Sequence, residues 1–313
     1  MQKRLHDGSF LQKYDRASLE EKVGISFQGN EQKRLDVLET ILYDAMNNEY
    51  DYLPLWLNKE KVSAMINPVY KIIKEGEIEF ITYTYDKEGK RSEAKTKREY
   101  KTIGSGIIIK KSEKEQKFLV LTARHVVDTP ALAPEKKDEQ GRTIFLAQIA
   151  THKILMVTSE TDRPVAEYGI ELRPLCQSRE ADVALLEGKS ASEDEFTRFS
   201  VSPLLGNSDD LAPGQIIYLV GFPFSLTKIY SSGIVLSLGN PYQSWDNTNF
   251  YTNATSNPGN SGGPLYALRD GKPELVGIMS WKITGSEGLH GAVQIKHVKN
   301  LLSECDLPTY FQK

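Results

Sequence analysis

The sequence predicts a mainly β protein, either a barrel or a sandwich, preceded by a small helical module. From Asn67 onward, many short runs rich in β-branched and aromatic residues are separated by turn residues, as in all-β folds. Up to about residue 60, apolar residues recur at helical spacing instead. We therefore expect two domains, residues 1–60 and residues 61–313.

The N-terminal module is expected to be helical for three reasons. The stretch "SLEE" at Ser18 to Glu21 fits a capping box, and "DYLPLWLN" can form a short helix with Pro54 in its first turn. Helical spacing is seen for Leu35, Leu38, Leu42 and Ala45. The alternative is that these helices only pack on the main domain.

The second domain is expected to consist of short strands followed by one helix. The strand candidates are "PVYKII", "EIEFITYTY", "KTIGSGIIIK", "KFLVLTAR", "TIFLAQIA", "HKILMVTS", "ADVALLEG", "GQIIYLVGF", "GIVLSLG", "ELVGIMSWKI" and "GAVQI", and the helix is "KHVKNLLSEC". The charged stretch Lys87 to Lys97 is interpreted as a solvated hairpin tip. Two further stretches, 128–143 and 159–169, are candidate regulatory loops or plain insertions.

Composition excludes several classes of function. With 39% hydrophobic and 26% charged residues and a net charge of −3, the chain has an ordinary globular composition and not that of a nucleic-acid binder. Its apolar runs are shorter than the about 20 residues that span a bilayer, and its basic start lacks the apolar core of a secretory signal. We expect no membrane partner and no nucleic-acid partner.

The cysteine and histidine patterns give no sign of a metal site. Cys176 and Cys305 lie far apart and form no CxxC unit, so we expect unpaired buried thiols in a cytoplasmic protein, with one disulfide as the alternative. Neither HExxH nor a cysteine–histidine cluster occurs. No metal and no cofactor are expected.

The stretch "NPGNSGGPL" at residues 257–265 concentrates glycine and proline around Ser261. Glycine permits unusual backbone angles and proline fixes φ, so the stretch predicts a shaped loop that presents the serine hydroxyl. An ordinary turn is the alternative. An α/β-hydrolase elbow, with Asp270 and His290 as partners, is disfavoured because no helix fits between Ser261 and the strand "ELVGIMSW".

Two upstream residues complete the order histidine, acid, serine. His125 directly follows an apolar strand, and Asp182 begins the apolar strand "ADVALLEG", where a carboxylate is costly to bury without a partner. Each residue alone has a structural explanation, as a core histidine or as a strand-end carboxylate. Their combination with the Ser261 loop favours a catalytic triad.

With these residues the sequence resembles a serine protease of the chymotrypsin fold, in the HtrA/Deg-like branch. The matching stretches are "GSGIIIK", "LTARHVV", "ADVALL", "LGNSDDLAPGQIIYLVGFPF", "SSGIVLSLG", "NATSNPGNSGGPLY" and "GAVQIKHVKNLL". The resemblance implies two six-stranded antiparallel β-barrels with the active site between them.

The resemblance also implies roles for the site residues. Ser261 would be the nucleophile, His125 the general base and Asp182 the residue that orients the imidazole. The oxyanion hole would lie in the loop of Gly259, Asn260 and Ser261, formed by the amides of Gly259 and Ser261. The substrate pocket would be bounded by Thr255, Ser256, Ser280, Trp281 and Lys282. With no acid at Thr255, small or medium apolar P1 residues are expected, or acidic ones if Lys282 reaches inward.

The expected function is a serine endopeptidase acting on protein or peptide substrates. HtrA-like proteins usually carry a PDZ domain after the protease, whereas this chain ends at Lys313, so recognition by a PDZ groove is not expected. Residues 1–60, which weakly resemble adaptor-type modules, are a candidate site for a regulatory protein partner. The alternatives are a catalytically silent binding module with the protease fold and a small-ester hydrolase.

Overall fold

The computed structural model describes residues 59–158, 169–239, 248–282 and 288–311. The chain divides into two compact units, Met1–Glu60 and Lys61–Lys313. The predicted helical module at residues 1–60 lies, except for its last two residues, outside the described part. Among the described residues, no helix is long and apolar enough to span a bilayer.

The first half of the described chain forms a closed barrel. Its elements are α4 (Lys59–Ile66), β1 (Val69–Tyr85), β2 (Arg91–Ser112), β3 (Lys117–Ala123), α5 (Arg124–Val127), β4 (Lys136–Lys137), β5 (Thr143–Val157), β6 (Gly169–Ser178) and β7 (Val183–Lys189). The sheet has the order β1-β2-β3-β7-β6-β5-β4, and an antiparallel pairing of β1 with β5 closes six of these strands into a ring.

Strands β3 and β7 are buried along nearly their whole length because both of their faces are covered. Phe118 and Val120 point into the barrel core, whereas Leu119 and Leu185 pack against Phe311 near the C-terminus. Continuous apolar runs are the sequence signature of strands that are covered on both faces. This double cover holds the end of β3, and the predicted His125 follows directly after it on α5.

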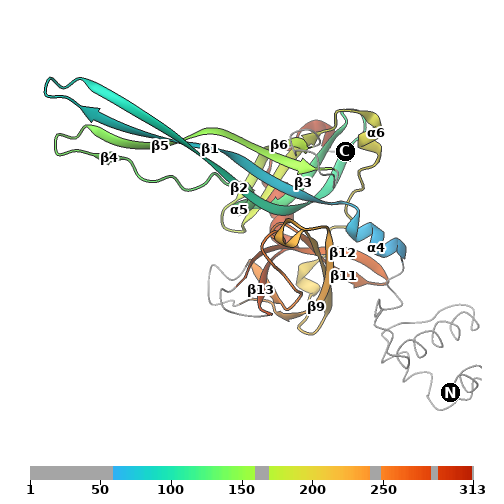
Figure 1. Ribbon diagram of the computed structural model, residues 1–313. Helices are drawn as coiled ribbons and strands as arrows, with labels where there is room; N and C mark the ends of the chain where they lie inside the picture. The colour runs from blue at the N-terminus through green and yellow to red at the C-terminus, as the bar shows by residue number, and fades with distance from the viewer. Residues whose placement is uncertain (1–58, 159–168, 240–247, 283–287, 312–313) are drawn as a thin grey trace, which may run out of the picture. The chain divides into compact units, whose positions relative to one another are not determined.

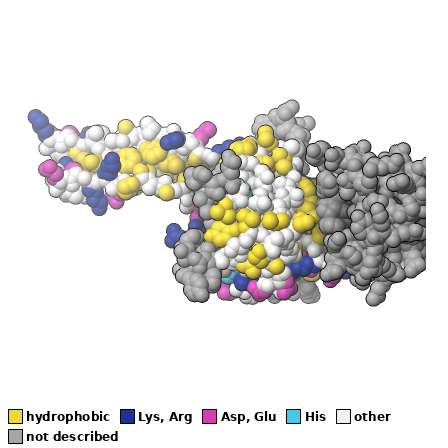
Figure 2. Space-filling model, turned by 90° about the horizontal axis from the view of Figure 1, so that it is seen from below, with side chains coloured by type: hydrophobic (Ala, Val, Ile, Leu, Met, Phe, Trp, Pro, Cys, Tyr) yellow, Lys and Arg dark blue, Asp and Glu magenta, His cyan; other side chains and the backbone are white. Residues whose placement is uncertain are grey.

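Strands β1, β2 and β5 run on beyond the barrel as a long arm (Figure 1). The expected break between "PVYKII" and "EIEFITYTY" is wrong, because β1 continues through Gly76, which pairs with Tyr100 and His152. The hairpin tip is also shorter than expected: the turn spans Asp86 to Lys90, and the following charged residues belong to β2. Figure 2 shows hydrophobic side chains gathered on one face of this arm.

The second half forms another closed barrel, in the order β10-β13-β12-β11-β8-β9. Its strands are β8 (Ile216–Gly221), β9 (Ile229–Ser237), β10 (Asn249–Thr252), β11 (Pro264–Arg269), β12 (Lys272–Lys282) and β13 (His290–Gln294), with short 3-10 turns η3 (Ser208–Asp210) and η4 (Pro223–Ser225) before and after β8. Strands β11 and β12 form a hairpin through Asp270 and Gly271, which both have positive φ. Ser261 is thus followed by the strands β11 and β12 with no helix between Ser261 and β12, which contradicts the α/β-hydrolase arrangement.

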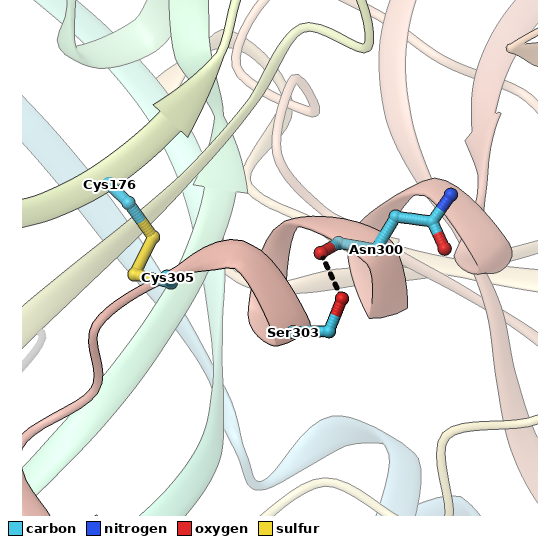
Figure 3. The surroundings of a disulfide bond; sticks show 4 residues. All are labelled: Cys176, Asn300, Ser303 and Cys305. Carbon is cyan, nitrogen blue, oxygen red and sulfur yellow. Dashed lines mark hydrogen bonds between the residues drawn. A yellow bond between two sulfur atoms is a disulfide. The ribbon is translucent and has the colours of Figure 1, made fainter.

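The C-terminal helix α7 (Ile295–Glu304) forms where the sequence predicts it. It is followed by the short turn η5 (Thr309–Phe311) and by no further described residue. The expectation of unpaired thiols is wrong, because Cys176 in β6 and Cys305 after α7 form a disulfide (Figure 3). The predicted chymotrypsin-like double barrel is confirmed by these two six-stranded rings.

Candidate active site

His125 lies on the single helical turn α5, directly after β3. The neighbouring Val126 and Val127 are buried in the first barrel, which leaves the His125 side chain 43% exposed. The turn is held at its end by Lys74, whose ammonium donates to the Asp128 carbonyl, and by an ion pair between Arg124 and Asp128. The apolar residues after His125 thus anchor the turn while the imidazole faces outward.

Asp182 reaches His125 from the turn that precedes β7. Its backbone has a φ of 50°, a left-handed conformation that aspartate tolerates better than most residues. The imidazole Nδ1 donates to Asp182 Oδ2 at 2.7 Å, and the His125 amide donates to Oδ1 at 3.0 Å. The carboxylate therefore fixes both the ring and the backbone of His125.

Ser280, in β12 of the second barrel, is a third donor to Asp182. Its hydroxyl donates to Asp182 Oδ2 at 2.5 Å, and the residue is only 3% exposed. Burial alone would raise the pKa of Asp182, but the hydrogen bonds from His125 and Ser280 outweigh it and hold this pKa below its usual value. The carboxylate is therefore ionised near neutral pH.

Sequence reasoning placed Ser280 in a substrate pocket and gave it no contact with Asp182. The signal that could have found this contact is a single hydroxyl in the apolar strand "VGIMSW", because a buried hydroxyl needs a hydrogen-bond partner. Which partner it finds depends on how the two barrels face each other. That arrangement is not visible in the local pattern.

Ser261 lies in a tight loop that is braced by backbone hydrogen bonds. The Asn260 amide donates to Asn257 O at 3.0 Å, and the Gly262 amide donates to Met279 O at 2.7 Å. Gly259 and Gly262 have φ values of 103° and 84°, and a Cβ on Gly262 would lie 2.1 Å from Ser105 O. The loop can therefore form only with glycine at these two positions.

The Ser261 hydroxyl donates to the Ser280 carbonyl at 3.3 Å. Within the described residues it makes no hydrogen bond to His125 in this structure. Ser280 nevertheless contacts both Asp182, through its side chain, and Ser261, through its backbone. His125, Asp182 and Ser261, which are far apart in the sequence, thus meet where the two barrels face each other.

The amides of the predicted oxyanion loop differ in whether they already donate a hydrogen bond within the protein. Within the described part of the chain, the amides of Gly259 and Ser261 donate no hydrogen bond, whereas the Asn260 amide is bonded to Asn257 O. The Pro258 carbonyl accepts from the Phe224 amide at 2.6 Å. Since N–H and C=O of a trans peptide point in opposite directions, the Gly259 amide points away from Phe224.

The remaining predicted pocket residues lie in two segments. Thr255 is exposed and Ser256 half-buried, and the Thr255 carbonyl accepts from the Ser231 hydroxyl at 3.1 Å. Trp281 and Lys282 end strand β12, directly after Ser280. Their side chains lie outside the described part, so the structure places only their backbone.

Comparison with known proteins relates this chain to a family of peptidases. Serine protease HTRA1 from Xenopus tropicalis is 31% identical over 175 residues, which cover 53% of this chain and 34% of the relative. A probable periplasmic serine endoprotease DegP-like from Pseudomonas fulva (strain 12-X) is 32% identical over 195 residues, with 62% and 32% covered. The chain thus spans about a third of the length of these relatives.

A solved structure supports the same fold. The HtrA-type protease AlgW with decapeptide matches with a TM-score of 0.51 at 17% identity, covering 79% of this chain and 67% of that chain. The family model described as "Trypsin-like peptidase domain" matches residues 104–278, which is more than half of the chain and includes His125, Asp182 and Ser261. The chain therefore belongs to the trypsin-like peptidase domain family, and within it the chain is similar to HtrA and DegP-like proteases.

Proposed function

We propose that this protein is a serine endopeptidase that hydrolyses peptide bonds through Ser261, His125 and Asp182. The observation that carries this proposal is the pair of hydrogen bonds from His125 to the two carboxylate oxygens of Asp182. They hold the imidazole in one tautomer, with the proton on Nδ1 and the lone pair on Nε2. Membership of a trypsin-like family supports the same activity.

The proposed reaction begins with a rotation of the Ser261 side chain. Its hydroxyl leaves the Ser280 carbonyl and donates to His125 Nε2, a contact that often tightens only when substrate binds. His125 accepts the proton as Ser261 Oγ attacks the scissile carbonyl, and it then gives the proton to the leaving amine. The ionised Asp182 stabilises the imidazolium that forms in between.

The amides of Gly259 and Ser261 are the proposed oxyanion hole. Both lack an acceptor within the described residues, and the negative oxygen of the tetrahedral intermediate would supply one. Asn260 contributes through its place in the loop, since its own amide is already bonded to Asn257.

Polypeptides are the proposed substrates, and one solved neighbour that matches this fold is itself a complex with a decapeptide. For the pocket we propose Thr255, Ser256, Ser280, Trp281 and Lys282, with small or medium apolar P1 residues preferred. Because Thr255 brings no negative charge, arginine and lysine gain no ion pair there. A peptide library cleaved mainly after arginine would contradict this preference.

A direct assay distinguishes the proposed activity from the two alternatives. An endopeptidase cleaves casein and loses that activity in Ser261→Ala. A small-ester hydrolase turns over a nitrophenyl ester but leaves casein intact, and a silent binding module turns over neither substrate.

Residues 1–60 are proposed as a regulatory module that controls the active-site loop. A cytoplasmic location remains a sequence-based prediction.

A further inference from the structure

The motif "GSG" at Gly104 to Gly106 contains a buried serine that the proposed chemistry does not use. Ser105 lies in β2 of the first barrel and is 0% exposed. A Cβ on Gly104 would lie 2.6 Å from Val126, the neighbour of His125, and one on Gly106 would lie 2.8 Å from Ile72. The two glycines thus allow β2 to approach its neighbours closely and bring Ser105 to the boundary between the barrels.

Ser105 is bonded to both sides of the Ser261 loop. Its hydroxyl donates to Gly259 O at 2.7 Å, and its amide donates to Ser261 O at 2.7 Å. The hydroxyl also accepts from the Phe222 amide at 3.0 Å, and the Ser105 carbonyl accepts from the Thr122 hydroxyl at 2.7 Å. One residue of the first barrel therefore joins two loop segments of the second.

These contacts determine which way the loop peptides face. The Gly259 carbonyl accepts from the Ser105 hydroxyl, and the preceding carbonyl, that of Pro258, accepts from the Phe224 amide. Phe224 lies two residues after Phe222, whose amide donates to the Ser105 hydroxyl. With both carbonyls held, neither peptide plane can rotate without breaking a buried hydrogen bond. The free amides of Gly259 and Ser261 lie on either side of the held Gly259 carbonyl.

We propose that Ser105 is a positioning residue whose hydroxyl holds the Gly259–Ser261 loop in the conformation that binds the oxyanion. This inference rests on the proposed function of Ser261. Its consequence is that Ser105 acts mainly on the transition state, because only there does the substrate oxygen carry the charge that the loop amides bind.

The variant Ser105→Ala leaves Gly259 O and the Phe222 amide without this partner. Removal of an oxyanion donor itself costs about 10²–10³ in kcat. Loss of a residue that only orients the donors should cost less, so we expect kcat to fall about 10-fold to 100-fold with KM nearly unchanged. Inhibition by a peptide boronic acid, whose tetrahedral adduct occupies the oxyanion hole, should weaken by a similar factor.

Ser208→Ala is the matched control. Ser208 is 1% exposed, and its hydroxyl accepts the Lys296 amide at 3.2 Å. A purely structural role for Ser105 predicts that both variants lower the unfolding midpoint and keep wild-type kcat at a temperature where they are folded. If Ser105→Ala does not fold, Ser105→Cys fills a similar space with a weaker hydrogen-bonding group and should show the same selective loss of kcat.

The measurement is steady-state peptide hydrolysis, boronic acid inhibition and circular dichroism on the full chain, wild type and variants side by side. A folded Ser105→Ala or Ser105→Cys protein with wild-type kcat and inhibitor affinity would overturn the role of Ser105 and leave the proposed function intact. A wild-type protein that neither cleaves peptides nor binds the boronic acid would overturn the proposed function, and this inference with it.

Discussion

The Asp182 carboxylate accepts three hydrogen bonds, two from His125 and one from Ser280, and these hold it in place in the candidate active site. Asp182→Asn should retain the fold, but the asparagine NH2 group would donate a hydrogen bond to His125 Nδ1. This favours the tautomer with the proton on Nε2, which cannot accept the proton of Ser261. We expect a loss of about 10⁴-fold in kcat, measured on a peptide substrate.

A suitable control is Asp138→Asn. Asp138 also has a lowered pKa, owing to hydrogen bonds from Arg142 and Gln140, but it lies in a surface turn outside the candidate site. This control should keep full activity. Equal activities of Asp182→Asn and Asp138→Asn would contradict the role of Asp182.

The lowered pKa of Asp182 also predicts a dependence of stability on pH. A carboxyl whose pKa is lower in the folded than in the unfolded state stabilises the fold above the unfolded value, about 3.9. This contribution is lost as the pH falls through the folded-state pKa. Urea unfolding at pH 7 and at pH 3 should therefore show a larger loss of stability for the wild type than for Asp182→Asn. A loss of stability of the same size in both proteins would contradict a contribution of the Asp182 pKa to the pH dependence of stability.

Single residues of the site could be predicted to different degrees. His125, Asp182 and Ser261 stand in an informative order next to apolar strands and a glycine-rich loop, and the structure brings them together. The bond from Ser105 to Gly259 could not be predicted, because it joins residues 154 positions apart in different barrels. Local sequence patterns carry no information about such distant pairs.

At the scale of elements, the sequence predicts many of the strands but misses β6 and β10, and it predicts strand ends poorly. The sequence predicts "PVYKII" and "EIEFITYTY" as two strands, whereas both belong to β1, which continues through Gly76. A Cβ at Gly76 would lie 2.1 Å from Thr151 O, so glycine is needed here for a close approach to β5. Turns and close strand contacts both select glycine, and the sequence alone does not distinguish them.

The disulfide joins the end of α7 to β6 of the first barrel (Figure 3) and closes a loop with a sequence separation of 129 residues. In the chain-entropy model, a disulfide that closes a loop of that length stabilises the fold by about 4–5 kcal/mol. Cys305→Ser should therefore lower the free energy of unfolding, and dithiothreitol should lower that of the wild type to the same level.

Ser303→Ala serves as a control on the same helix end, where the Ser303 hydroxyl donates to Asn300 O at 2.7 Å. The Ser303→Ala protein keeps the disulfide, so dithiothreitol should lower its free energy of unfolding as much as it lowers that of the wild type. Wild-type stability that is unchanged by the reductant would show that the disulfide contributes nothing to stability.

Because structural disulfides are rare in reducing compartments, the cysteine pattern no longer supports the cytoplasmic prediction.

At the scale of the whole molecule, the candidate site requires both barrels. His125 and Asp182 come from the first, and Ser261 and Ser280 come from the second. A site of this kind can be regulated by any contact that shifts the Ser261 loop between an ordered and a disordered state. Residues 1–60 are proposed to regulate activity through such a shift.

The regulatory proposal predicts that a chain beginning at Lys61 differs from the full chain in peptide turnover. Residue 260 is an asparagine and cannot form the ion pair with a newly released N-terminus that activates trypsin-like zymogens, so we expect the change without any further cleavage. Turnover and intact mass of both chains test this. Equal turnover, with activity appearing only after the full chain is clipped, would favour a zymogen instead.

The most direct test of the central claim is labelling of the full chain with a fluorophosphonate, which reacts with an activated serine, followed by mass spectrometry of the peptides. We predict one adduct, on Ser261, that is lost in Ser261→Ala and strongly reduced in His125→Ala. A folded wild-type protein without an adduct, or one labelled equally in Ser261→Ala, would contradict the assignment of Ser261 as the nucleophile.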